Sequence, residues 1–204
     1  MSAHRVSRRS LRLALVGLVS LGLVLTGCSG SDPLADQYRE GSGKGYIAGD
    51  GSVTEIAADD RGESVVFDGT LEDGSTVSSA DYAGEVLVVN FWYASCAPCR
   101  AEAPDLKKIS EEFADQGASF LGVNVRDQAA SAIAFNQSYE ISYPSVMDDD
   151  GGMQLAFSGK IPPNAVPTTL VLDSSGRVAA RILGQVNSPS ILATLIKDTI
   201  AEDG

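Results

Sequence analysis

Apolar residues occur in short blocks from about residue 62 onward, and the spacing within each block predicts a strand or a helix. Residues 86–92 form an almost unbroken apolar and aromatic run, interrupted by Asn90, as expected for a central strand that is covered on both faces. Apolar residues then recur at helical spacing as far as Gly117, which is a natural helix terminator. Pro104 lies inside this helical pattern and should kink the helix, because it removes one backbone hydrogen bond.

The remaining blocks predict an alternating order of strands and helices. Two short apolar stretches, at residues 65–67 and near Val77, are separated by Asp-Gly turn signals and predict a hairpin before the central strand. After the first helix, the pattern predicts a strand at 120–125, a helix at 129–140, an extended piece at 143–147, paired strands at 168–172 and 178–183, and a last helix around 191–200. This order predicts an α/β domain with a mixed central sheet and helices on both faces.

The N-terminal segment, residues 1–27, has the pattern of a signal peptide. Four arginines precede a short uncharged apolar run that is too short to span a bilayer, and small residues follow it. Residues 25–28, Leu-Thr-Gly-Cys, resemble the lipobox of bacterial lipoproteins, in which the cysteine carries lipid. We therefore expect an exported protein that is anchored through lipid on Cys28 to the outer face of the cell membrane.

The stretch from 28 to 61 is rich in glycine and lacks sustained apolar periodicity, so it predicts a flexible linker. A short strand near Tyr46 and Ile47 is the one element that its pattern suggests. The folded domain is expected to occupy residues 62–204.

Charge and composition exclude several classes of function. Removal of residues 1–27 changes the net charge from −12 to −16, because 11 basic and 27 acidic residues remain. Such a field disfavours phosphate backbones, so we expect no nucleic-acid partner. His4, the single histidine, lies in the segment that is removed. Catalytic sites that need an imidazole base, and most zinc and copper sites, therefore lose their commonest component.

Cys96 and Cys99 are separated by Ala97 and Pro98, and they follow the central strand where the first helix begins. A thiol at a helix N-terminus lies near unsatisfied backbone N–H groups, which favour the thiolate, and Arg100 adds a nearby cation. Cys99 is close enough to attack a mixed disulfide on Cys96, so the pair predicts a two-electron exchanger. The alternatives are an inert disulfide and a metal site. A disulfide that closes a four-residue loop stabilises the fold little, because it constrains the unfolded chain little. Two cysteines supply only half of the four ligands of a tetrahedral metal site.

Residues 90–104, Asn-Phe-Trp-Tyr-Ala-Ser-Cys-Ala-Pro-Cys-Arg-Ala-Glu-Ala-Pro, resemble the active-site segment of the TlpA/ResA-like thioredoxin family of membrane-tethered thiol-disulfide reductases. Gly-Val-Asn-Val at 122–125 and Val-Pro-Thr-Thr at 166–169 fall where that family has its next strand and its cis-proline loop. The resemblance, which runs from about residue 62 to the C-terminus, implies a thioredoxin fold with an N-terminal hairpin extension.

The same resemblance assigns roles to individual residues. It makes Cys96 the attacking thiol and Cys99 the resolving thiol of a redox-active disulfide. Pro167 is implied to be cis and to lie beside the disulfide, where the backbone of Val166 presents an edge to the substrate chain. We also expect Trp92 to contribute to substrate binding.

Two positions depart from the family pattern. Thioredoxins place a buried aspartate where this chain has Asn90, and an amide cannot shuttle a proton. In ResA-like members an acid just past the second strand lies near the cysteines, and Asp127 matches that position. Ser95 stands where the family commonly has tryptophan, which leaves a less covered site.

We expect this protein to exchange disulfides with exported proteins and to act as a reductant. An upstream membrane thiol donor is expected to supply its electrons. Apocytochrome c is a candidate substrate because some relatives act on it. No metal and no cofactor beyond the dithiol is expected. The alternatives are a thiol peroxidase, or a non-catalytic module that binds Cu(I) or a partner through the two cysteines. A peroxidase of the peroxiredoxin type would want threonine or serine where this chain has Tyr93.

Overall fold

The computed structural model describes residues 52–162 and 165–203 of the chain. The predicted signal peptide, the lipid-bearing Cys28 and the suggested strand near Tyr46 and Ile47 lie outside the described residues. Within the described part, no helix is both long enough and apolar enough to cross a membrane.

A six-stranded mixed sheet forms the centre of the domain, in the order β1-β8-β7-β4-β5-β6. Its strands are β1 (Val53–Glu55), β4 (Val86–Trp92), β5 (Ala118–Asn124), β6 (Ser145–Met147), β7 (Thr168–Leu172) and β8 (Val178–Leu183). Strands β4, β5 and β6 run parallel to one another, whereas β7 is antiparallel to both β4 and β8. All seven residues of β4 are buried, as its apolar run predicts for a central strand.

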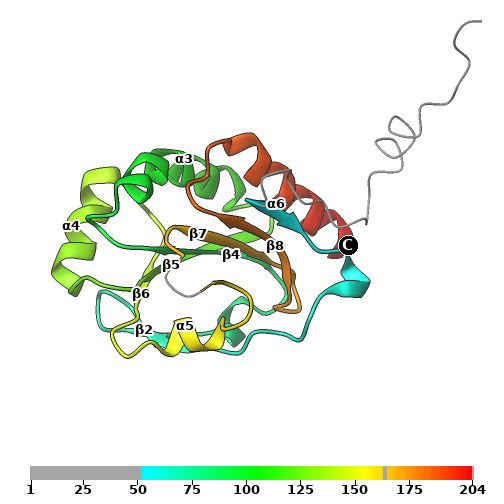
Figure 1. Cartoon of the computed structure of the whole chain (residues 1–204), viewed down its shortest axis with the longest axis horizontal. Helices are drawn as coiled ribbons and strands as arrows, with labels where there is room; N and C mark the ends of the chain where they lie inside the picture. The colour runs from blue at the N-terminus through cyan, green and yellow to red at the C-terminus, as the bar shows by residue number, and fades with distance from the viewer. Residues whose placement is uncertain (1–51, 163–164, 204) are drawn as a thin grey trace, which may run out of the picture. The chain divides into compact units, whose positions relative to one another are not determined.

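Helices cover both faces of this sheet, which confirms the predicted architecture. They are α3 (Ala97–Phe113), α4 (Ala129–Tyr139), α5 (Gly152–Ala156) and α6 (Pro189–Asp203). Figure 1 shows α3 and α6 on one side of the sheet and α5 on the other. Alternate residues of β4 explain the two layers, because Val86 and Val88 pack with α3 and α6 while Leu87 and Val89 face the opposite core.

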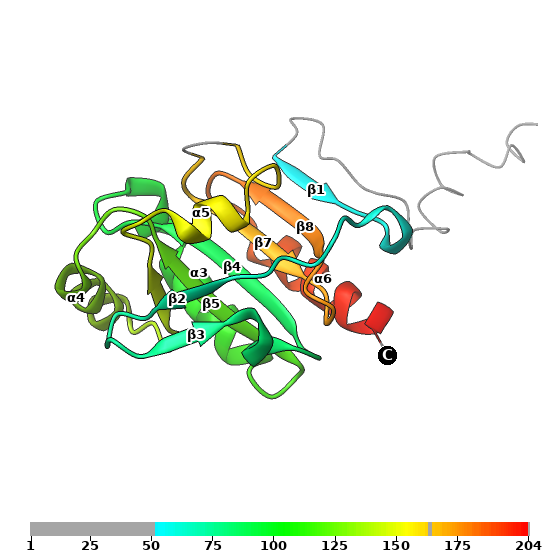
Figure 2. The same cartoon turned by 90° about the horizontal axis from the view of Figure 1, so that it is seen from below.

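The predicted hairpin is present; its second strand lies around Val77 as predicted, whereas its first strand begins at Asp68, later than the predicted stretch at 65–67. Strands β2 (Asp68–Thr70) and β3 (Thr76–Ser78) pair antiparallel and cross the face of the sheet that carries α5 (Figure 2). Val65 and Phe67, which were predicted to form the first strand, are buried in the core beneath the hairpin instead. Their apolar character reflects packing against the sheet and not strand pairing.

The predicted boundary between linker and domain at residue 62 is wrong. Strand β1 pairs with β8 at the edge of the sheet, and a short 3-10 helix follows at Ala58–Asp60. Arg61 then lies between α6 and the end of β7, where its guanidinium contacts the carboxylates of Asp173, at 3.1 Å, and Glu202. These partners are more than a hundred positions away along the chain, so the local glycine-rich composition could not indicate them.

Helix α3 continues past Pro104 to Phe113. Helix α5 was not predicted, because its five residues are too few to show helical periodicity.

Candidate active site

Cys96 and Cys99 form a disulfide at the start of α3, with their Cα atoms 5.2 Å apart. Strand β4 ends at Trp92, and a short turn brings Cys96 to the N-cap position of the helix. The Sγ atom of Cys96 accepts a hydrogen bond from the backbone N–H of Cys99 at 3.1 Å. The sulfur therefore lies where the helix N-terminus stabilises negative charge, as the position of the motif predicts.

The disulfide is buried within a small cluster of its own. Cys96 and Cys99 are 3% and 2% exposed, and they pack with Trp92 and Ala132. Partly buried side chains complete the cluster, namely Tyr93, Ala94, Phe135, Met147 and Val166. The neighbours of the cysteines in sequence, Ser95, Ala97 and Pro98, are exposed.

The peptide bond between Val166 and Pro167 is cis, as predicted. Val166 packs against the cysteine cluster, and the carbonyl of Pro167 accepts a hydrogen bond of 2.9 Å from the N–H of Gly184. The cis-proline segment therefore lies beside the disulfide at the start of β7.

Trp92 lies in the interior of the domain, and its expected contribution to substrate binding stays a prediction. The side chain is buried, its ring packs 4.4 Å from that of Phe135, and its indole N–H donates to Ser145 at 3.3 Å. A Cβ atom on Gly122 would lie 2.9 Å from the indole nitrogen, so this glycine leaves the room that the ring needs. Trp92 packs against the two cysteines inside the domain. Its indole N–H can be buried because Ser145 accepts its hydrogen bond.

Asp127 lies close to the cysteine motif, and its carboxylate holds the loop that leads into it. The carboxylate accepts hydrogen bonds from the backbone N–H of Ala94, at 2.5 Å, and from the side-chain amide of Asn124, at 2.9 Å. These contacts give Asp127 a positioning role. Its predicted part in proton transfer remains a prediction.

Glu102 is a buried acid in the active site that the sequence interpretation missed. It is 1% exposed and lies on α3 one turn after Cys99. Its two carboxylate oxygens accept hydrogen bonds from the amide of Asn90, at 3.0 Å, and from the N–H of Val186, at 2.7 Å. Burial raises the pKa of Glu102 to about 7, although these two hydrogen bonds act in the opposite direction.

A signal for Glu102 was present in the helical pattern. Glu102 is in register with Leu106, Ile109 and Phe113 along the apolar stripe of α3, so a charged residue stands where the pattern calls for an apolar one. An acid on a buried stripe next to two cysteines is a candidate for proton transfer.

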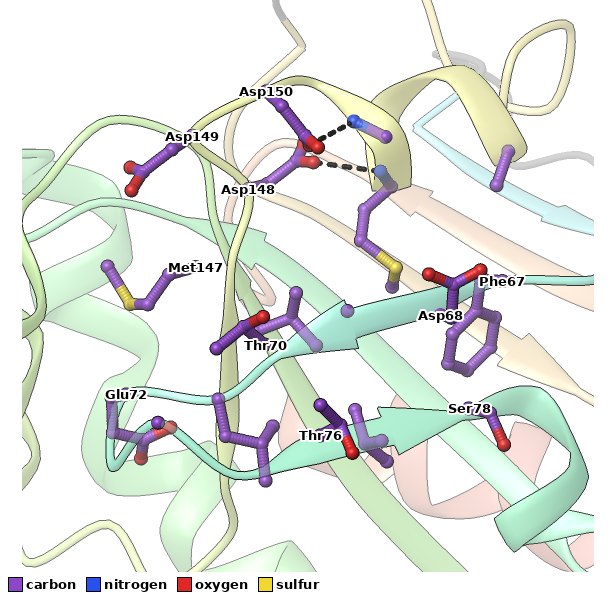
Figure 3. A pocket seen from close by; sticks show the side chains of 18 of the residues that line it. Phe67, Asp68, Thr70, Glu72, Thr76, Ser78, Met147, Asp148, Asp149 and Asp150 are labelled. Atoms are coloured by element: carbon purple, nitrogen blue, oxygen red, sulfur yellow. Dashed lines mark hydrogen bonds between the residues drawn. The ribbon is translucent and has the colours of Figure 1, made fainter.

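A cavity of about 1070 Å³ opens on the hairpin side of the domain (Figure 3). Among the described residues, no lysine or arginine lines this cavity. Carboxylates from the hairpin region and from the segment before α5 line it, namely Asp68, Glu72, Asp81, Asp148, Asp149 and Asp150. Met147 belongs both to this lining and to the cysteine cluster. Because neither cysteine lines the cavity, the redox chemistry belongs to the separate site at the start of α3.

Comparisons with known proteins agree with this site. Residues 57–196 match the family model described as Redoxin. The thiol-disulfide oxidoreductase ResA of Bacillus subtilis (strain 168) is 29% identical over 123 residues, which cover 59% of this chain and 66% of that protein. The chain thus spans slightly less than two thirds of the length of this relative.

Two solved structures are similar over nearly their whole length. A secreted thiol-disulfide isomerase from Corynebacterium glutamicum is 30% identical, with a TM-score of 0.68 and coverage of 76% of this chain and 99% of that one. A DsbF homologue from Corynebacterium diphtheriae is 31% identical, with a TM-score of 0.65 and coverage of 77% and 99%. The chain therefore belongs to the Redoxin family, and its described part has the thioredoxin-like fold that the residues around Cys96 and Cys99 implied.

Proposed function

We propose that this protein is an extracytoplasmic thiol-disulfide oxidoreductase that reduces disulfides of exported proteins. The observation that carries the proposal is the Cys96–Cys99 disulfide at the N-terminus of α3, beside the cis Val166–Pro167 peptide. The relatives described as thiol-disulfide oxidoreductase and isomerase support the same chemistry.

The reaction begins with the reduced dithiol. The Cys96 thiolate attacks one sulfur of the substrate disulfide, which forms a mixed disulfide and releases the other substrate sulfur as a thiolate that takes up a proton. Cys99 then loses its proton and attacks the Cys96 sulfur, which releases the second substrate thiol. Two electrons pass to the substrate, and the protein is left with the Cys96–Cys99 disulfide.

Glu102 is the group best placed to take the proton from Cys99. It lies one turn further along the same helix and on the same buried side. A carboxyl whose pKa lies near 7 is present in both its acidic and its basic form near neutral pH, which suits a proton acceptor that must later release the proton. Asn90 and the N–H of Val186 hold the carboxylate in place.

We infer that electrons flow from this protein to its substrate. The net charge of −16 after loss of residues 1–27 opposes strong stabilisation of the Cys96 thiolate, and a weakly stabilised thiolate makes a better reductant. A reduction potential nearer to about −270 mV, as in thioredoxin, than to about −120 mV, as in DsbA, is expected. An upstream membrane thiol donor would restore the dithiol after each cycle.

Lipid on Cys28 would tether the domain to the outer face of the cell membrane. The arrangement of residues 1–28 supports this, as does the description of the Corynebacterium glutamicum relative as secreted. Replacement of Cys28 by alanine in the full chain is expected to move the protein from the detergent phase to the aqueous phase in a Triton X-114 partition. Retention in the detergent phase would contradict the lipid anchor.

The proposed activity is tested by trapping. Cys99→Ser should accumulate mixed disulfides between Cys96 and exported proteins, whereas Cys96→Ser should trap none and should not reduce insulin. The absence of trapped proteins in a strain where the wild-type protein is active would overturn the proposal. Rapid hydrogen peroxide consumption without insulin reduction would favour a thiol peroxidase.

A further inference from the structure

Two exposed arginines lie next to the cysteine motif on different elements. Arg100 lies in the first turn of α3, directly after Cys99, and its Nε donates to the hydroxyl of Tyr139 at 3.2 Å. Arg126 follows β5, and its guanidinium lies 4.0 Å above the ring of Tyr93. The carbonyl of Tyr93 in turn accepts a hydrogen bond of 3.1 Å from the N–H of Cys96, which ties Arg126 to the turn that carries the attacking sulfur.

Neither arginine has its charge neutralised within the described part of the chain. Several other basic side chains in the described part of the chain form salt bridges with carboxylates, namely Arg61, Lys107, Arg177 and Lys197. Arg100 and Arg126 form no salt bridge there; the hydroxyl of Tyr139 accepts a hydrogen bond from Arg100, and the ring of Tyr93 contacts Arg126. A single hydrogen bond to a hydroxyl, or contact with an aromatic ring, orients a guanidinium and leaves most of its N–H groups available for a carboxylate.

The acid that follows Arg126 in the sequence does not neutralise this charge. Asp127 follows Arg126 directly, but its carboxylate turns toward the backbone of Ala94 and the amide of Asn124. A protein with a net charge of −12 thus carries two unpaired positive charges next to its cysteine motif, one directly after Cys99 and one above the ring of Tyr93. Charges at the rim of a contact surface act mainly on the rate of association and on the choice of partner.

We propose that Arg100 and Arg126 select polypeptides that carry acidic residues next to the disulfide to be reduced. The partner's aspartate or glutamate side chains pair with the two guanidinium groups while its sulfur meets Cys96. This inference rests on the proposed disulfide reductase function and adds a substrate preference to it.

A general effect of the arginines on the Cys96 thiolate is separable from this preference. Stabilisation of the thiolate changes the reaction rate with every disulfide by the same factor. Recognition of an acidic flank changes the ratio of the rates for two substrates that differ only in that flank. The ratio is therefore the quantity to measure.

The experiment uses two synthetic peptides with the same internal disulfide, one flanked by two glutamates on each side and the other by two lysines. Reduced full-length protein is mixed with each peptide, and the fluorescence of Trp92, which packs in the cysteine cluster, reports the reaction by stopped flow. The rate constants are measured at 20 mM and 500 mM NaCl for wild type, Arg100→Gln and Arg126→Gln. Lys108→Gln is the control, because Lys108 is an exposed cation further along α3 and its loss changes the net charge equally.

We expect each arginine variant to lower the glutamate-to-lysine rate ratio by about threefold at low salt, as for exposed charge pairs, and by less at high salt. Lys108→Gln should leave the ratio within about 1.5-fold of wild type, since its charge lies away from the disulfide. Arg126→Lys, which keeps the charge, should preserve most of the preference and excludes an effect of misfolding.

A ratio that is unchanged in both arginine variants, or that falls equally in Lys108→Gln, overturns the substrate preference alone. If wild type reduces neither peptide, the proposed function itself fails.

Discussion

The carboxylate of Glu102 accepts a hydrogen bond of 3.0 Å from the side-chain amide of Asn90, across the interface between α3 and β4. The same amide also donates to the hydroxyl of Thr169 on β7, at 3.1 Å. Thioredoxins place their buried acid at the position of Asn90, whereas here the acid projects from the helix toward that position. A buried acid is therefore present beside this position, and it comes from a different element.

Glu102 should make the stability of the fold depend on pH. Its pKa of about 7 in the folded chain lies above the ordinary value of 4.5, so the folded chain holds this proton more tightly than the unfolded chain. The stabilisation is complete below about pH 4.5 and is lost as the pH rises through about 7. The free energy of unfolding should fall by up to about 3 kcal/mol across this window because of this group.

Urea unfolding of wild type and Glu102→Gln between pH 4.5 and 8 measures this effect. Because glutamine does not titrate, the difference between the two proteins should follow the predicted fall. Parallel curves for wild type and variant across the whole range would contradict the assignment.

Glu102→Gln should also slow the second half of the reaction. Without a carboxylate to accept the proton of Cys99, the mixed disulfide on Cys96 should persist, with resolution at least about tenfold slower at pH 8. Quenching the reaction with acid and separating the species on a gel measures the lifetime of this intermediate. Glu111→Gln, which removes an exposed glutamate of the same helix, should resolve the mixed disulfide at the wild-type rate.

The positioning role of Asp127 predicts different outcomes for two substitutions. Asp127→Ala removes the acceptor for the N–H of Ala94 and should lower the free energy of unfolding by about 1–3 kcal/mol. Asp127→Asn keeps an acceptor oxygen and should retain most of both stability and exchange rate. A stable Asp127→Asn variant with a large loss of rate would instead favour the predicted role in proton transfer.

Arg61 should contribute to stability without affecting the redox reaction. Its side chain is 2% exposed and pairs with the buried carboxylate of Asp173, so Arg61→Gln leaves part of that charge unpaired. Because Arg177 also pairs with Asp173, we expect a loss of about 2–3 kcal/mol in the free energy of unfolding, below the full cost of breaking a buried pair. Chemical denaturation measures the loss, and an insulin reduction assay should give the wild-type rate.

The chemistry of the site could be predicted from local sequence because its parts are close together along the chain. Residues 86–100 specify a buried strand, a turn and a helix start, and this local order alone places Cys96 at the helix N-terminus. The cis peptide at Pro167 was predicted through family resemblance, since a proline by itself is cis in only about 5–6% of folded cases. The structure confirms both the position of Cys96 at the helix N-terminus and the cis peptide bond before Pro167.

What the sequence determined by itself was the order of the main strands and helices and the identity of the reactive pair, because both follow from spacing over a few residues. Tertiary structure decided which polar groups surround that pair. Glu102 meets Val186 across 84 positions, and Arg61 meets Asp173 across 112. Such contacts depend on how separate elements pack together. For this reason the hydrogen-bond partners of the buried acid, the inclusion of residues 53–61 in the domain and the contacts of Trp92 became visible only in the folded chain.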